Sequence, residues 1–214
     1  MRRRSVLRRP FRYQHYNVVL WIVGANVIVF ALTSFAAGLT NLLAMNPLET
    51  TRAGMVWQPF TYMFVHSPTN YAHILFNMFG LFIFGTQVEN RIGSTEFLVF
   101  YLLSGLFAGI ISLAVYLVSG AVYIQLLGAS GAVFATLLAY ATLFPDSTIY
   151  LFAILPIKAP ALVLGFTALE LFRGLSNPAS GVAHLTHLAG FVVAFVYFVV
   201  RLGINPLRVF AGRE

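Results

Sequence analysis

The sequence contains no cysteine, and only 9% of its 214 residues are charged. The missing thiols exclude disulfide frameworks, thiolate zinc sites, iron–sulfur clusters and cysteine nucleophiles. An average soluble domain is roughly 25% charged, whereas here 59% of the residues are hydrophobic and the mean hydropathy is +0.85. With so few polar groups to cover a surface, the chain is neither a soluble globule nor a disordered segment. We therefore expect an all-α polytopic membrane protein.

Positive charge gathers at the amino terminus. The chain holds thirteen Lys and Arg residues against six Asp and Glu, and six of the arginines lie within residues 1–12. A basic arm followed directly by an apolar run is typical of a membrane topology signal, which argues against a nucleic-acid partner. A cleaved signal peptide starts in a similar way. Here, however, the hydrophobicity continues to the end of the chain, so we interpret the first run as a retained span.

Apolar runs divide the chain into six predicted membrane spans. A span takes about 20 residues as a helix, or fewer where a segment is interrupted. The spans are predicted at residues 18–37, 71–88, 97–118, 130–144, 159–172 and 182–200. Residues 1–17 then form a basic arm, residues 18–202 a single six-span catalytic domain and residues 203–214 a short tail.

The distribution of basic residues predicts the orientation. An even number of spans leaves both termini on one side of the membrane. That side holds eleven of the thirteen basic residues, and the other side holds Arg52 and Arg173. By the positive-inside rule, both termini are expected in the cytoplasm of a cell, in a plasma or inner membrane. A site in the outer half would then open to the extracytoplasmic side.

Four polar side chains occupy positions where a bilayer should hold none. They are His73 and Asn77 in the second span, Ser130 at the head of the fourth and His187 in the sixth. Polar residues inside spans are costly, and they are functional candidates by default. At about 1.5 Å per residue, counted from the cytoplasmic ends, they lie about 18 to 24 Å up, in a hydrocarbon core about 30 Å thick. A common depth on three helices predicts a single site.

The chemistry at that depth fits acyl transfer. Ser130 stands between the small residues Gly128 and Gly131, which permit a tight turn and leave backbone N–H groups free for an anion. A serine needs a base to take its proton, and His187 is the candidate in the facing spans. His73 and Asn77, spaced i and i+4, share a helix face from which they can stabilise an oxyanion. No Asp or Glu is expected near His187, so the pattern predicts a Ser–His dyad.

Each of these residues also has an ordinary structural explanation. A serine in a membrane helix mostly bonds to its own backbone, and an asparagine can join two helices. His184 and His187 could bind a metal, but HExxH is absent and Glu170 is the only acid in the flanking segments. No metal and no cofactor are therefore expected. His66 lies in a loop and is expected to be solvated.

The motifs together resemble the rhomboid family of intramembrane serine proteases, from the first span through the sixth. They occur in family order, as His73-Ile-Leu-Phe-Asn77, Gly85 through Glu89 to Gly93, Gly128-Ala129-Ser130-Gly131, and Ala183 through His187 to Gly190. The resemblance implies a six-helix core with Ser130 as nucleophile and His187 as general base. It further implies an oxyanion site formed by His73, Asn77 and the backbone amide of Ser130.

The resemblance also assigns supporting positions. Phe134 stands where an aromatic ring often packs on the catalytic histidine, and Gly128, Gly131 and Gly190 lie in the motifs. Gln58 replaces the arginine of the family's Trp-Arg pair in the first loop, residues 38–70, which weakens any inference about how that loop is anchored.

The predicted function is that of an endopeptidase that cleaves transmembrane or membrane-adjacent segments of other proteins. Its partners are such substrates and the lipid bilayer, and the sequence does not give the oligomeric state. One alternative is a non-proteolytic relative that binds membrane proteins, which would tolerate the loss of Ser130 or His187. A small-solute transporter is the other, but a transport path needs polar groups in both halves of the membrane.

Overall fold

The computed structural model describes residues 10–151, 154–176 and 182–213. Residues 1–9 of the predicted basic arm lie outside this part, so the arm stays a prediction. The elements in chain order are α1 (Val18–Phe35), α2 (Ala37–Leu43), α3 (Pro47–Arg52), α4 (Gln58–Thr61), α5 (Tyr71–Gly80), α6 (Thr86–Ile92), α7 (Ser94–Ser119), α8 (Ser130–Leu143), β1 (Thr148–Leu151), β2 (Leu155–Lys158), α9 (Ala159–Ser176), α10 (Val182–Tyr197) and α11 (Pro206–Phe210).

Five helices in the described part are long and apolar enough to cross a membrane. They are α1, the continuous helix Tyr71–Ile92 formed by α5 and α6 through a π-helical turn, α7, α9, and His184–Leu202 within α10 and its extension. The predicted polytopic, mostly helical class is thereby confirmed. Helix α8 has 14 residues, about 21 Å of rise, and does not reach across a core of about 30 Å by itself. The count of six spans stays a prediction.

A short β-hairpin departs from the all-α prediction. Strands β1 and β2 pair antiparallel between α8 and α9, with Ile149 opposite Ile157 and Tyr150 opposite Pro156. Proline is excluded from a helix interior because it lacks an N–H and clashes with the preceding turn, and β-branched residues favour strands. The predicted start of the fifth span at residue 159 matches the start of α9.

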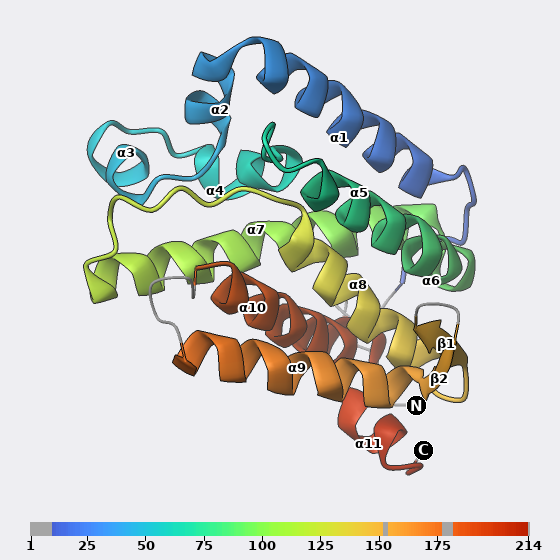
Figure 1. Cartoon of the computed structure of the whole chain (residues 1–214). Coiled ribbons are helices and arrows are strands. Elements are labelled where there is room, and N and C mark those ends of the chain that lie inside the picture. Colours follow the sequence, from blue (N-terminus) through green and yellow to red (C-terminus); the bar gives the residue numbers. More distant parts are fainter. Residues whose placement is uncertain (1–9, 152–153, 177–181, 214) are drawn as a thin grey trace, which may run out of the picture.

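Helix α8 lies at the centre of the bundle (Figure 1). It passes between α5 and α6 on one side and α9 and α10 on the other, and it packs on α5, α7, α9 and α10. Most of its residues are buried: Gly131, Ala132, Ala135, Thr136, Leu137, Leu138, Ala139, Ala141 and Thr142. Small side chains allow membrane helices to approach closely. A Cβ added to Gly190 of α10 would collide with the backbone carbonyl of Gly131, so this crossing depends on glycine.

The segment before α8 is attached to the first loop. Met45 and Leu126 exchange two backbone hydrogen bonds, of 2.9 and 2.8 Å, and the Gly128 amide donates to the Tyr62 carbonyl at 3.0 Å. These bonds hold the segment that leads to Ser130, the first residue of α8, against the first loop.

Buried Gln58 anchors the first loop. Its amide nitrogen donates to the Asn41 carbonyl at 3.1 Å, and its amide oxygen accepts from the Thr50 hydroxyl at 2.8 Å and the Asn46 amide at 3.1 Å. A neutral amide thus ties three parts of the loop together at the position where the family resemblance led us to expect an arginine.

Glu89 has a structural role that the sequence did not reveal. Its buried carboxylate accepts from the amides of Val18 at 2.7 Å and Val19 at 3.0 Å, and Ser94 also bonds to it. The first amides of a helix have no partner within the helix, and a negative charge there complements the helix dipole. Glu89 therefore caps α1 from a different span.

Candidate active site

Ser130 begins α8 two residues after a glycine with an unusual backbone conformation. Gly128 has φ +123°, a value that side chains strongly disfavour. A Cβ on Gly128 would also lie 2.7 Å from His73 Nε2 and 3.8 Å from Ser130 Oγ. Both the backbone conformation and the contact with His73 therefore require glycine at this position. Because glycine has no side chain, the His73 imidazole can approach the start of α8.

His187 is held against α8 by its neighbours. Its ring stacks on Phe134, with the ring centroids 4.1 Å apart and the planes 11° from parallel. Phe134 lies one helical turn after Ser130, and the close contact between Gly131 and Gly190 brings α10 to the same level. Face-to-face contact with an aromatic ring fixes the plane of the imidazole beside the predicted nucleophile.

The side chain of Asn77 lies on α5 and is buried. Its amide nitrogen donates to the carbonyl of His73 at 2.8 Å, which leaves its second N–H free of that bond. His73 and Asn77 therefore share a face of α5, as their spacing predicts.

Most of the predicted site residues make contacts in the structure, and these contacts form two groups. His73, Gly128 and Ser130 meet on one side, and Phe134, Gly131, Gly190 and His187 meet on the other. Within the described part of the chain, the Ser130 hydroxyl makes no hydrogen bond, so the pairing of Ser130 with His187 stays a prediction. Hydrogen bonds of catalytic groups are often long in ligand-free enzymes and shorten when substrate binds.

His66 was expected to be solvated, and that expectation is wrong. The side chain is buried, its ring lies 5.1 Å from that of His73, and its Nε2 accepts from the Ala129 amide at 3.5 Å. Burial lowers the pKa of His66 from 6.5 to about 4, so the ring is neutral at physiological pH. The sequence held no signal of this contact, because the first loop folds back onto the start of α8.

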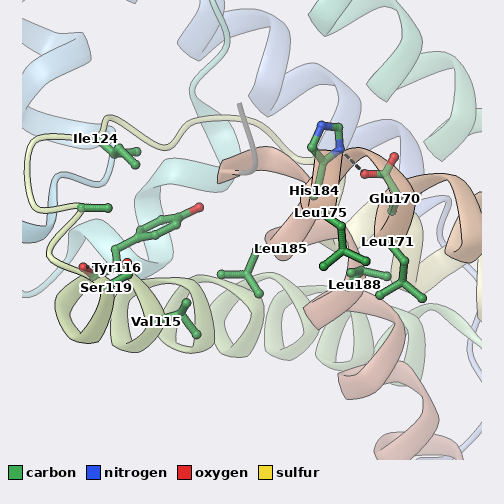
Figure 2. A pocket seen from close by; sticks show the side chains of 12 residues that line it. Val115, Tyr116, Ser119, Ile124, Glu170, Leu171, Leu175, His184, Leu185 and Leu188 are labelled. Atoms are coloured by element: carbon green, nitrogen blue, oxygen red, sulfur yellow. Dashed lines mark hydrogen bonds and ion pairs between the residues drawn. The ribbon is translucent and has the colours of Figure 1, made fainter. Parts of the chain in front are cut away.

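The expectation that no acid approaches His187 is also wrong. Glu170 Oε2, on α9, lies 3.2 Å from His187 Nδ1 and 2.5 Å from His184 Nδ1. Figure 2 shows Glu170 and His184 facing each other. Both line a cavity of about 320 Å³, whose other walls are mainly apolar residues of α7, α9 and α10. A signal was present in the sequence, because a carboxylate within an apolar span is a functional candidate by default.

The same three residues offer nitrogen and oxygen atoms of the kinds that zinc binds. One ligand atom each from Glu170, His184 and His187 lies within 4.8 Å of the others. Two histidines and a carboxylate form a known zinc ligand set. The hydrogen bond between the Glu170 carboxylate and His184 explains the cluster equally well without a metal.

Comparison with known proteins identifies the family that the sequence motifs resemble. A family model described as the Rhomboid domain matches residues 53–203. The chain is 31% identical to "RHOMBOID-like protein 12, mitochondrial" of Arabidopsis thaliana, over 87% of this chain and 59% of the relative. It is 29% identical to "Rhomboid protein 1, mitochondrial" of Saccharomyces cerevisiae, over 72% and 45% respectively. It is 33% identical to "Rhomboid protease GlpG" of Salmonella typhi, over 42% and 33%.

Two facts from these comparisons bear on the whole protein. The chain spans less than three fifths of the length of each of these relatives. The prediction of a plasma or inner cell membrane is wrong, because the two relatives that match most of this chain are mitochondrial proteins. A multi-pass membrane location is supported.

Proposed function

The chain belongs to the rhomboid family, and on this premise we propose that it is an intramembrane serine endopeptidase with Ser130 as nucleophile and His187 as general base. The proposal is supported above all by one observation. His73 approaches Gly128 just before the start of α8, and the imidazole of His187 stacks on Phe134 one turn after Ser130.

The proposed reaction is acyl transfer in two halves. His187 takes the proton of the Ser130 hydroxyl as Oγ attacks the carbonyl carbon of the scissile peptide bond. His187 then gives that proton to the leaving amine, and an acyl-enzyme remains on Ser130. Water, activated by the same histidine, hydrolyses the ester and regenerates the serine. The stacking of Phe134 on His187 supports this role, since it holds the imidazole in one plane through both proton transfers.

The oxyanion of the tetrahedral intermediate needs donors in place before it forms. We assign them to His73, the free N–H of Asn77 and the backbone amide of Ser130. As the first residue of α8, Ser130 has an amide without a partner inside the helix. The approach of His73 Nε2 to Gly128 supports its assignment.

We expect Asn77→Ala to lower kcat about tenfold while KM changes little, because an oxyanion donor acts mainly in the transition state. Loss of an oxyanion donor that no neighbour can replace costs about 10²–10³-fold in kcat. The loss here should be smaller, because His73 and the Ser130 amide remain as donors. Cleavage kinetics in reconstituted vesicles measure both constants.

Asn26 offers a matched control for that variant. It is buried on α1, and its side-chain amide donates to the Ile22 carbonyl at 2.8 Å. Asn77 makes the equivalent bond, to the carbonyl four residues earlier, on α5. Asn26→Ala should leave kcat unchanged. A rise in KM alone in Asn77→Ala, or equal losses in both variants, would assign Asn77 to binding or packing.

We propose that residues 18–202 form one six-span domain between a basic arm, residues 1–17, and a tail, residues 203–214, with both termini on one side of the membrane. The eleven-to-two division of basic residues supports this arrangement. The names of the plant and yeast relatives favour a mitochondrial membrane. Proposed substrates are transmembrane proteins, whose cleaved segment must unwind to expose a peptide bond.

A fluorophosphonate probe tests the serine mechanism directly, because it reacts with an activated serine and leaves a stable adduct. The detergent-solubilised protein should be labelled on Ser130, as mapped by mass spectrometry of its peptides. Labelling at another serine, or none in a protein that cleaves a membrane substrate, would contradict the proposal.

A further inference from the structure

Glu170 is a buried carboxylate in the middle of an apolar helix. Its side chain is 5% exposed, and it points from α9 toward His184 of α10 (Figure 2). The same carboxylate oxygen also lies within contact distance of the His187 imidazole. An unpaired charge in such surroundings costs several kcal/mol, so buried acids persist where partners compensate. The partners here are His184 and His187, which the i, i+3 spacing brings to one face of α10.

The two contacts differ in quality. His184 Nδ1 makes a hydrogen bond of 2.5 Å to Oε2, as the dashed line in Figure 2 marks. His187 Nδ1 lies 3.2 Å from the same oxygen without the direction of a full hydrogen bond. Buried Nδ1 of His187 has no hydrogen-bond partner among the described residues, and the Glu170 carboxylate is the acceptor that lies within its reach.

The nitrogen that faces Glu170 matters for the chemistry. A neutral imidazole carries one proton, and Nε2 can serve as a base when that proton is on Nδ1. A carboxylate beside Nδ1 stabilises this tautomer. It also stabilises the imidazolium that exists after His187 has taken the proton of Ser130.

We propose that Glu170 is a positioning residue that orients His187 and supports its positive charge, so that the site works as a Ser–His–Glu arrangement. This inference rests on the proposed serine mechanism and replaces the predicted dyad. Phe134 fixes the plane of the His187 ring, and Glu170 fixes its tautomer and its rotation within that plane. His184 bonds to the same carboxylate oxygen, and this bond joins α10 to α9.

Glu170→Gln tests the proposal, since the amide keeps the shape of the side chain and removes its charge. We expect kcat to fall about 10²-fold with KM within twofold. This is less than the about 10⁴-fold loss when the acid of a full triad becomes an amide, because the contact with Nδ1 lacks direction. The endpoint of fluorophosphonate labelling counts folded sites, so a lowered labelling rate with an unchanged endpoint separates slow chemistry from misfolding.

His184→Ala is the matched control because it removes the other half of the same cluster. It should keep kcat within threefold while the melting temperature falls. Equal loss of kcat in both variants would mean that the carboxylate only ties α9 to α10, and unchanged kcat in Glu170→Gln would also overturn the proposal. Loss of wild-type activity on removal of metal by EDTA would identify the cluster as a metal site instead. Cleavage by Ser130→Ala would refute the serine mechanism itself, an outcome distinct from these.

Discussion

Ser130→Ala is expected to abolish proteolysis and fluorophosphonate labelling while the fold stays intact. Removing the nucleophile of a serine protease costs on the order of 10⁶-fold in kcat, so no cleavage should be detected above background. The hydroxyl makes no hydrogen bond within the described part of the chain, so its loss should not lower the melting temperature. Cleavage of a transmembrane substrate in vesicles measures the activity.

Ser34 provides the control for this experiment. It lies exposed on α1, and its hydroxyl donates to the Phe30 carbonyl at 2.7 Å, as serines in membrane helices commonly do. Ser34→Ala should therefore cleave at the wild-type rate. Undiminished cleavage by the Ser130→Ala protein would rule out the serine mechanism.

His187→Ala should match Ser130→Ala in its loss of activity, and the double variant should be no worse than either. Nucleophile and base act as one unit, so their effects do not add. His187 stacks on Phe134 of α8, whereas His184 lies with its ring 6.4 Å from that of His187 and bonds to Glu170.

His184→Ala should keep measurable turnover, because a histidine one turn from the base cannot replace its attack geometry and is not needed for it. Loss of a hydrogen bond to a buried carboxylate should cost about 1–3 kcal/mol of stability. Initial cleavage rates and thermal melts of the two variants give both results. An active His187→Ala protein beside an inactive His184→Ala protein would show that the base had been assigned to the wrong histidine.

The sequence by itself determined where most helices run and at what height along them the polar residues lie. Apolar length set the spans, proline ended them, and the structure starts α8 at Ser130 and α9 at Ala159, as predicted. Depth follows from the rise per residue, about 1.5 Å, which is the same in every helix. The sequence also identified the family, through motifs whose order and spacing are local properties of the chain.

Only the tertiary structure decided which side chains meet. Successive residues turn by about 100° around a helix axis, so depth alone does not fix direction; rotation and tilt depend on packing against neighbours. In the sequence, Glu170 is only an acid within an apolar run. In the tertiary structure, α9 packs on α10 and brings the Glu170 side chain to His187. His66 becomes buried because the first loop folds against the start of α8, and Glu89 caps α1 across a gap of 70 residues. These contacts join residues that are distant in sequence, and so the close packing of the helices determines them.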